Sequence, residues 1–154
     1  MPDNSGTAST ALLMRDVGDA VSMNWGCGNS GGSGASMNNV AGALVNTFGY
    51  TSASLSGYNH TTLKQQIRWN RPVILSGFME ENCFLWWCGY ETGHAWVCDG
   101  YRSTTYCETG STYTYIHMNW GWDGLHNSYY AYNNWNPGDF TFNENRKMVY
   151  NIRP

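Results

Sequence analysis

The sequence predicts one α+β domain in which two or three helices precede an antiparallel β-sheet. With 154 residues, the chain is long enough for one hydrophobic core and too short for two ordinary domains. We expect a single domain over residues 1–154, with a helical part over about 9–70 and a sheet part over about 71–154. The order, helices first and strands afterwards, is typical of the α+β class.

Two helices are expected before residue 50. The first follows a polar stretch over residues 1–8 and is predicted by apolar residues at roughly helical spacing, namely Leu12, Leu13, Val17, Ala20 and Val21. A glycine- and serine-rich stretch runs from Asn24 to Ser36, and the second helix then carries Val40, Ala41, Leu44 and Val45. Ser36 is well placed to cap this helix, and Gly49 is its expected stop signal.

A short third helix is expected over residues 62–69, because Leu63 and Ile67 lie on one face, and Pro72 then forces extended backbone. The segments that follow have the β-branched and aromatic content of strands: residues 72–77, 93–102, 112–122, 128–134 and 147–154. Gly, Asn and Asp turns separate them, which predicts an antiparallel sheet. Residues 80–90 are unusually aromatic, and we interpret them as a hairpin whose Trp86 and Trp87 pack on the sheet, with an exposed flap as the alternative.

The charge balance argues against nucleic acid and anionic membranes as partners. The formal net charge is -3 at pH 7, and the Lys and Arg residues are scattered singly. No stretch approaches the roughly 18 apolar residues of a membrane-spanning helix, and the polar start MPDNSG is not a signal peptide. Charged residues make up 12% of the chain, about half the usual share, which favours a secreted protein whose signal lies upstream.

The cysteines do not form a recognisable framework. Their number is odd and their spacing matches no zinc pattern: Cys27, Cys83, Cys88, Cys98 and Cys107. Cys83 and Cys88 are close enough in sequence to close a small loop, and at least one thiol should remain free. A zinc site built from His94, His117 and a cysteine is disfavoured, because these residues lack the close pairing of such sites. We therefore expect no metal or cofactor.

Two segments combine rare residues with tight glycines: GHAWVCDGY over residues 93–101 and HMNWGWDG over residues 117–124. A cysteine peptidase needs a histidine that takes and returns a proton and an amide that orients the ring, and His94 and Asn119 are the candidates. Two adjacent antiparallel strands are able to place Asn119 beside His94, and Trp120 then shields their hydrogen bond from water. Spacing alone leaves a second interpretation open, since a lone strand histidine is more often structural.

The order of several motifs resembles the second part of streptopain-family cysteine peptidases, which have a papain-like fold. The motifs are LMRDVGDAVSMNWG, SGAS, FGY, RPVILSG, GHAWVCDGY, IHMNWGW and the closing NIRP. The resemblance implies that His94 is the catalytic histidine and that Asn119 and Trp120 orient and shield it. It also implies that Ser33, Gly34 and Ala35 border the substrate cleft and help to form the pocket for the apolar side chain that precedes the scissile residue.

One part of the family pattern is absent from this sequence. The nucleophilic cysteine of the family lies upstream in a GC-x-A-T-A segment at the start of a central helix, where a thiol is most readily ionised. We therefore expect the chain to be the histidine-bearing part of a secreted bacterial endopeptidase that hydrolyses peptide bonds. It would require a cysteine-bearing N-terminal lobe as its partner and be inactive alone.

Two alternatives remain open at this point. In one, Cys27 serves as the nucleophile of a self-contained enzyme. In the other, the chain is a catalytically inactive, aromatic-rich module that binds a peptide, an inhibitor or a glycan. Cys98 is expected to be a small buried residue, Asp99 and Gly100 to form a turn, and His117 to share a strand face with Asn119. His60 and His126 are not expected to be functional.

Overall fold

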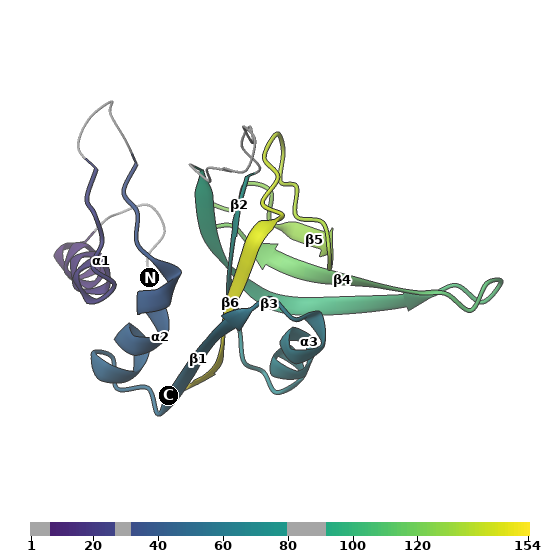
Figure 1. The fold of residues 1–154 in the computed structure, drawn as a ribbon, viewed down its shortest axis with the longest axis horizontal. Helices are drawn as coiled ribbons and strands as arrows, with labels where there is room; N and C mark the ends of the chain where they lie inside the picture. The colour runs from purple at the N-terminus through teal and green to yellow at the C-terminus, as the bar shows by residue number, and fades with distance from the viewer. Residues whose placement is uncertain (1–6, 27–31, 80–91) are drawn as a thin grey trace, which may run out of the picture.

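The structure is a computed structural model that describes residues 7–26, 32–79 and 92–154. These residues form three helices and an antiparallel six-stranded sheet with the strand order β1-β6-β2-β3-β4-β5 (Figure 1). The elements in chain order are α1 (Ala8–Ala20), α2 (Met37–Asn46), β1 (Ser52–Gly57), α3 (His60–Arg68), β2 (Val73–Phe78), β3 (Gly93–Thr105), β4 (Thr112–Asn119), β5 (Ser128–Ala131) and β6 (Glu144–Arg153). The predicted α+β class is confirmed.

Side chains cap the helices where the chain enters them. Ser36 Oγ accepts a hydrogen bond from the backbone N–H of Asn38 at 3.3 Å, so Ser36 caps α2 as predicted. α1 begins at Ala8, earlier than its apolar residues suggested, because Thr7 accepts from the N–H of Thr10. α3 begins at His60, two residues before its predicted start, with Asn59 as the cap.

The sequence analysis did not predict β1. Its residues, SASLSG, are mostly small and polar, so they carry little of the β-branched and aromatic signal of strands. The strand forms because it pairs with β6, with Leu55 opposite Val149, and because α2 packs against both strands. Its place in the sheet is therefore decided by residues about a hundred positions downstream.

The core lies on the face of the sheet that α3 covers. Leu63 of α3 is completely buried with Leu75 of β2 and Trp96 of β3 in one cluster. Three further large side chains of this cluster come from the segments after β4 and β5, namely Trp120, Trp135 and Phe142. Lys147 of β6, whose Nζ donates to Asn38 Oδ1 of α2 at 3.2 Å, lies on the opposite face. α1 packs mainly on α2, away from the core.

Candidate active site

His94 lies at the start of β3, and a close contact holds the backbone there. Gly93 is paired with Phe78 of β2, and a Cβ atom at Gly93 would lie 2.7 Å from the Phe78 ring. Only glycine fits against the ring at this distance, so the chain enters β3 in a fixed position. The half-buried side chain of His94 follows directly, on the same face of the strand as Trp96.

Four aromatic rings surround the imidazole of His94, and we call them the aromatic box: Trp96, Trp120, Trp122 and Phe142. The distances between their centroids and that of His94 range from 4.8 Å for Trp122 to 6.2 Å for Trp120. Trp120 is completely buried, and Phe142 is 2% exposed. The box therefore restricts the imidazole to a narrow range of orientations and excludes water from much of its surface.

The one hydrogen bond of the His94 ring within the described residues determines which nitrogen carries the proton. Nε2 lies 2.8 Å from the backbone carbonyl oxygen of Trp120. A carbonyl oxygen only accepts, so Nε2 is the donor, and in the neutral ring Nδ1 keeps its lone pair. The geometry thus presents His94 as a base at Nδ1.

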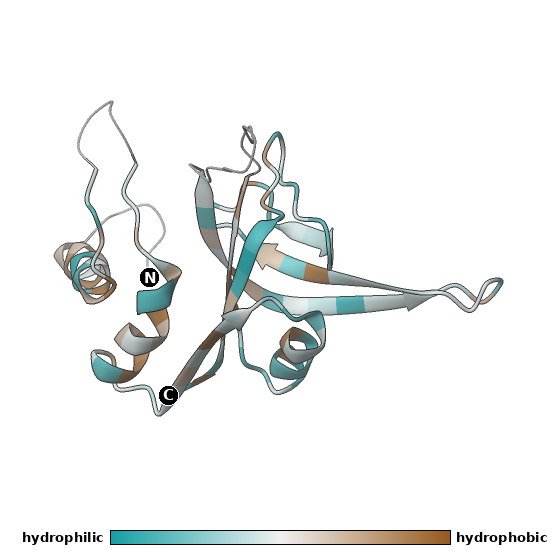
Figure 2. Cartoon of the chain, viewed as in Figure 1, coloured by the Kyte–Doolittle hydropathy of each residue, from teal (hydrophilic) through white to brown (hydrophobic). Residues whose placement is uncertain are grey.

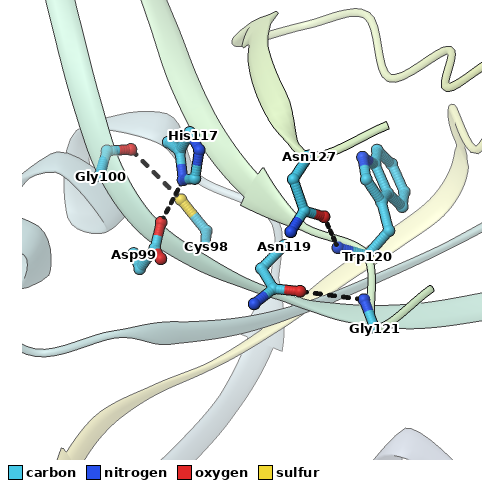
Figure 3. A network of polar contacts seen from close by, with 8 residues as sticks. All are labelled: Cys98, Asp99, Gly100, His117, Asn119, Trp120, Gly121 and Asn127. Atoms are coloured by element: carbon cyan, nitrogen blue, oxygen red, sulfur yellow. Dashed lines mark hydrogen bonds and ion pairs between the residues drawn. The ribbon is translucent and has the colours of Figure 1, made fainter. Parts of the chain in front are cut away.

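Two hydrogen bonds hold the turn over residues 119–121 (Figure 3). Its middle residue, Trp120, supplies the carbonyl oxygen that lies 2.8 Å from His94 Nε2. The backbone N–H of Trp120 donates to Asn127 Oδ1 at 3.0 Å, and the N–H of Gly121 donates to Asn119 Oδ1 at 3.1 Å. Gly121 has φ +76°, a left-handed conformation that suits glycine and ends the strand before Trp122. Three consecutive residues are therefore held by side-chain hydrogen bonds and backbone conformation.

Asn119 and His94 do not form the predicted hydrogen bond. Asn119 is opposite Val97 in the register of β3 and β4, so it lies on the other face of the sheet from His94 and Trp96. Its oxygen is instead bonded to Gly121, and its side chain is exposed. Of the two predicted partners, Trp120 contacts His94 in this structure and Asn119 does not. The catalytic roles of all three residues stay predictions.

Ser33, Gly34 and Ala35 are exposed in the segment between α1 and α2. Gly34 is bonded to Asn24 through a short antiparallel bridge, with N···O distances of 2.8 and 3.0 Å. Ser33 Oγ accepts from the N–H of Gly26 at 3.2 Å. No hydrogen bond joins these three residues to His94, and their predicted contact with a substrate stays a prediction.

Of the cysteines that the structure describes, neither is placed to serve His94. Cys98 is completely buried, and burial raises the pKa of its thiol to about 12, so the nucleophilic thiolate is strongly disfavoured. The expectation that Cys98 is a small buried residue is confirmed. Cys107 is free and exposed, beyond the far end of β3. The hypotheses about a reactive Cys27, a Cys83–Cys88 loop and an aromatic hairpin over 80–90 concern residues outside the described ranges.

The predicted turn at Asp99 and Gly100 is wrong. Both residues lie inside β3, where the register with β4 shifts between Cys98 and Gly100. The irregularity lets the carboxylate of Asp99 reach His117 of β4, with 2.5 Å between Oδ1 and Nδ1 (Figure 3).

In residues 7–26, 32–79 and 92–154, His, Cys, Asp and Glu side chains do not gather in threes as metal ligands. None of the helices described is long and apolar enough to cross a membrane.

Sequence reasoning missed three residues that shape this site. Trp122 stacks on His94, Phe142 packs against it at a tilt, and Asn127 accepts a hydrogen bond from the backbone N–H of Trp120. Trp122 carried a signal, because it closes the same NWGW motif as Asn119 and Trp120. Phe142 and Asn127 carried none, because only the tertiary fold brings them to β3 and β4.

The chain is similar to known proteins in both sequence and structure. Residues 2–130 match the sequence model described as the Peptidase C10 family. The chain is 31% identical over 153 residues to the thiol protease/hemagglutinin PrtT of Porphyromonas gingivalis. The match covers 94% of this chain and 16% of PrtT. It is also similar to the structure of active wild-type Prevotella intermedia interpain A cysteine protease, with a TM-score of 0.71 and 28% identity over 96% of this chain and 58% of that one. Both relatives are therefore considerably longer than this chain.

Proposed function

The chain belongs to the Peptidase C10 family, the streptopain family of cysteine peptidases, and from this premise we propose that it supplies the histidine half of an endopeptidase active site. His94 is the general base and acid in this proposal, and a cysteine outside the chain is the nucleophile. The observation that carries the proposal is the hydrogen bond from His94 Nε2 to the Trp120 carbonyl, which leaves Nδ1 able to accept a proton.

The proposed reaction uses both nitrogens of His94. Nδ1 takes the proton of the cysteine thiol, and the thiolate attacks the carbonyl carbon of a peptide bond. The imidazolium then returns this proton to the leaving amine, and a water molecule hydrolyses the thioester in the second half of the cycle. The Trp120 carbonyl accepts from Nε2–H throughout, which stabilises the imidazolium while it exists.

We propose that Asn119 and Trp120 act on His94 in different ways. Trp120 contacts the imidazole through its ring and its carbonyl oxygen. Asn119 orients His94 indirectly, because its Oδ1 holds Gly121 and with it the turn from which the Trp120 carbonyl projects. Asn119→Ala should accordingly lower kcat/KM by about tenfold, the equivalent of one lost hydrogen bond, and less than a change at His94.

Exposed apolar residues of α1 support the proposal that a partner segment carries the cysteine. Leu12, Leu13 and Met14 are 48%, 43% and 61% exposed, and Figure 2 shows apolar residues along this helix. Neighbouring apolar residues at such exposure suit an interface better than a surface in water. Interpain A, of which this chain covers 58%, has additional chain length for such a segment.

The substrates in this proposal are proteins or peptides, and Ser33, Gly34 and Ala35 border the cleft that receives them. The three residues are exposed beside the Asn24–Gly34 bridge, where an extended peptide can reach them. We further propose that the protein acts outside a bacterial cell. Both relatives come from bacteria, and the surface composition of the chain is poor in charge.

The test compares His94→Ala with His60→Ala in the complete parent protein, including its cysteine-bearing segment. His60 is an exposed histidine whose ring contacts Tyr132 and none of the rings of the aromatic box, and it is the matched control. We expect His94→Ala to lower kcat/KM for casein hydrolysis by at least about 100-fold and added imidazole to restore part of the loss. His60→Ala should retain the activity of the unmodified protein.

Labelling with an epoxysuccinyl peptide, followed by intact mass and peptide mapping, identifies the nucleophile. An adduct on a cysteine outside this chain, absent in His94→Ala, supports the proposal. An adduct on Cys27 would place the nucleophile inside the chain, and full activity of His94→Ala would remove the assigned base.

A further inference from the structure

The far end of the β3–β4 ribbon forms a second cluster of aromatic residues, separate from His94. Beyond Tyr101, β3 pairs with β4 alone through residues 102–105 and 112–115, and the ribbon projects from the rest of the molecule (Figure 1). Tyr106 is twelve residues from His94, or about 40 Å along the strand at 3.3 Å per residue. The two regions therefore do not share a site.

A cavity of about 230 Å³ lies at this end of the ribbon, and we call it the tyrosine pocket. Its lining is Tyr106, Glu108, Thr109, Tyr113 and Tyr115. The Tyr106 and Tyr113 side chains are 55% and 52% exposed, and their rings meet edge to face at 5.4 Å and 87°. Two tyrosine rings at right angles therefore line the pocket, together with the acidic residue Glu108.

Hairpin stability accounts for only part of this arrangement. An edge-to-face pair stabilises two strands by about 0.5–1.5 kcal/mol, so the contact of Tyr106 with Tyr113 has a structural use. That use requires neither Tyr115 nor Glu108 in the lining. The ribbon is also joined by hydroxyl pairs, Ser103 with Thr114 at 3.2 Å and Thr105 with Thr112 at 2.9 Å.

We propose that the tyrosine pocket binds a compact organic cation, an ammonium or guanidinium group carried by a lysine or arginine side chain of a protein partner. The faces of the tyrosine rings are electron-rich and attract cations, and Glu108 supplies a negative charge beside them. The lining itself contains no lysine or arginine, and the guanidinium of Arg102 contacts only one of the lining rings, that of Tyr115. Rings at right angles enclose a compact group, whereas a sugar ring stacks best on one flat aromatic face.

The same ribbon already binds a guanidinium in this manner. The guanidinium carbon of Arg102 lies 5.2 Å from the ring centre of Tyr115 and 4.7 Å from that of Tyr129. Arg102 is the basic residue of β3 closest to the pocket, and its guanidinium lies over these two rings. The contact is an internal example of the chemistry that the tyrosine pocket offers to a partner.

The test is an NMR titration of the ¹⁵N-labelled 154-residue chain with choline and with 3,3-dimethyl-1-butanol, its uncharged isostere of nearly equal shape. We expect choline to shift the backbone resonances of residues 106–115 and the neutral alcohol to shift them much less. Tyr106→Leu should weaken choline binding about fivefold and Glu108→Gln about threefold, whereas Tyr106→Phe, which keeps the ring, should retain it. A lysine-containing peptide should compete with choline.

Three results would overturn the proposal: equal binding of the alcohol, binding of maltose in preference to choline, or unchanged affinity in both Tyr106→Leu and Glu108→Gln. The exposed position of these side chains keeps the variants folded, which the dispersion of the remaining resonances checks. The readout does not involve peptide hydrolysis. A negative choline titration would therefore leave the role proposed for His94 unaffected. Loss of the role proposed for His94 would likewise leave the tyrosine pocket unaffected.

Discussion

The two ends of the β3–β4 ribbon both gather aromatic rings, but they expose them to very different degrees. At the His94 end, Trp96 and Trp120 are 3% and 0% exposed, whereas Tyr106 and Tyr113 at the other end are more than half exposed. The difference comes from what covers the strands. Trp135 and Phe142, from the segments after β5, close over the first end, and the second end has only its own two strands.

Aromatic residues serve two different purposes at the two ends of this ribbon. Buried rings at the His94 end fix the position of one imidazole and exclude water from it, which suits proton transfer. Exposed rings at the ribbon end offer their faces to solvent, which suits the binding of a partner. Substitutions at the two ends should therefore differ in their effects on stability.

The largest difference should appear when one ring is removed from each end. Trp120→Ala leaves a large cavity in the core and should lower the free energy of unfolding by about 3–5 kcal/mol. Tyr113→Ala should cost about 1 kcal/mol or less, because half of that side chain is already in water. Urea unfolding followed by tryptophan fluorescence measures both. Equal losses would contradict the division of the ribbon into a buried and an exposed end.

A smaller effect is expected from the turn that carries the Trp120 carbonyl. Asn127→Ala removes the acceptor of the Trp120 N–H and should lower the free energy of unfolding by about 2 kcal/mol, since a partly buried donor is left unpaired. It should also shift the imidazole resonances of His94. Asn133→Ala, at an exposed asparagine with no hydrogen bond to the rest of the described chain, is the matched control. Unchanged imidazole resonances in Asn127→Ala would mean that Asn127 does not position the carbonyl.

The smallest effect concerns the pH dependence of stability at the buried end. Burial raises the pKa of Cys98 from an ordinary 9.0 to about 12, so the thiol ionises first in the unfolded chain. Its contribution to stability is therefore complete below pH 9 and decreases as the pH rises from 9 toward 12. Between pH 8 and pH 10 the protein should lose about 1 kcal/mol from this thiol.

Urea unfolding at pH 8 and pH 10 checks this expectation. Cys98→Ala should reduce the difference in stability between the two pH values by the same amount, about 1 kcal/mol, although the alanine destabilises the protein at both. Cys107→Ala, at an exposed thiol beyond the end of β3, should leave the difference unchanged. If the two variants behave alike, Cys98 is not the group responsible.

The fold class, the family and the segments around the site could all be predicted from local sequence. Helical spacing before residue 70 and β-rich segments after it predicted the α+β order, and Ser36 was recognised as a cap because its bond to Asn38 is local. His94 and Trp120 stood out because each lies in a short motif of rare residues and glycines. All of these signals come from neighbours in sequence.

Contacts between distant segments could not be predicted in this way, because they depend on the packing of the whole chain. β1 had no signal of its own, because its pairing partner β6 lies at the other end of the chain. Asn119 was expected beside His94, but the register of β3 and β4 pairs it with Val97, and a shift of one residue moves a side chain to the opposite face. Register is fixed by packing over the whole sheet. For this reason the Trp120 carbonyl contacts His94, and Phe142 and Asn127 complete the site from segments that no local pattern connects to it.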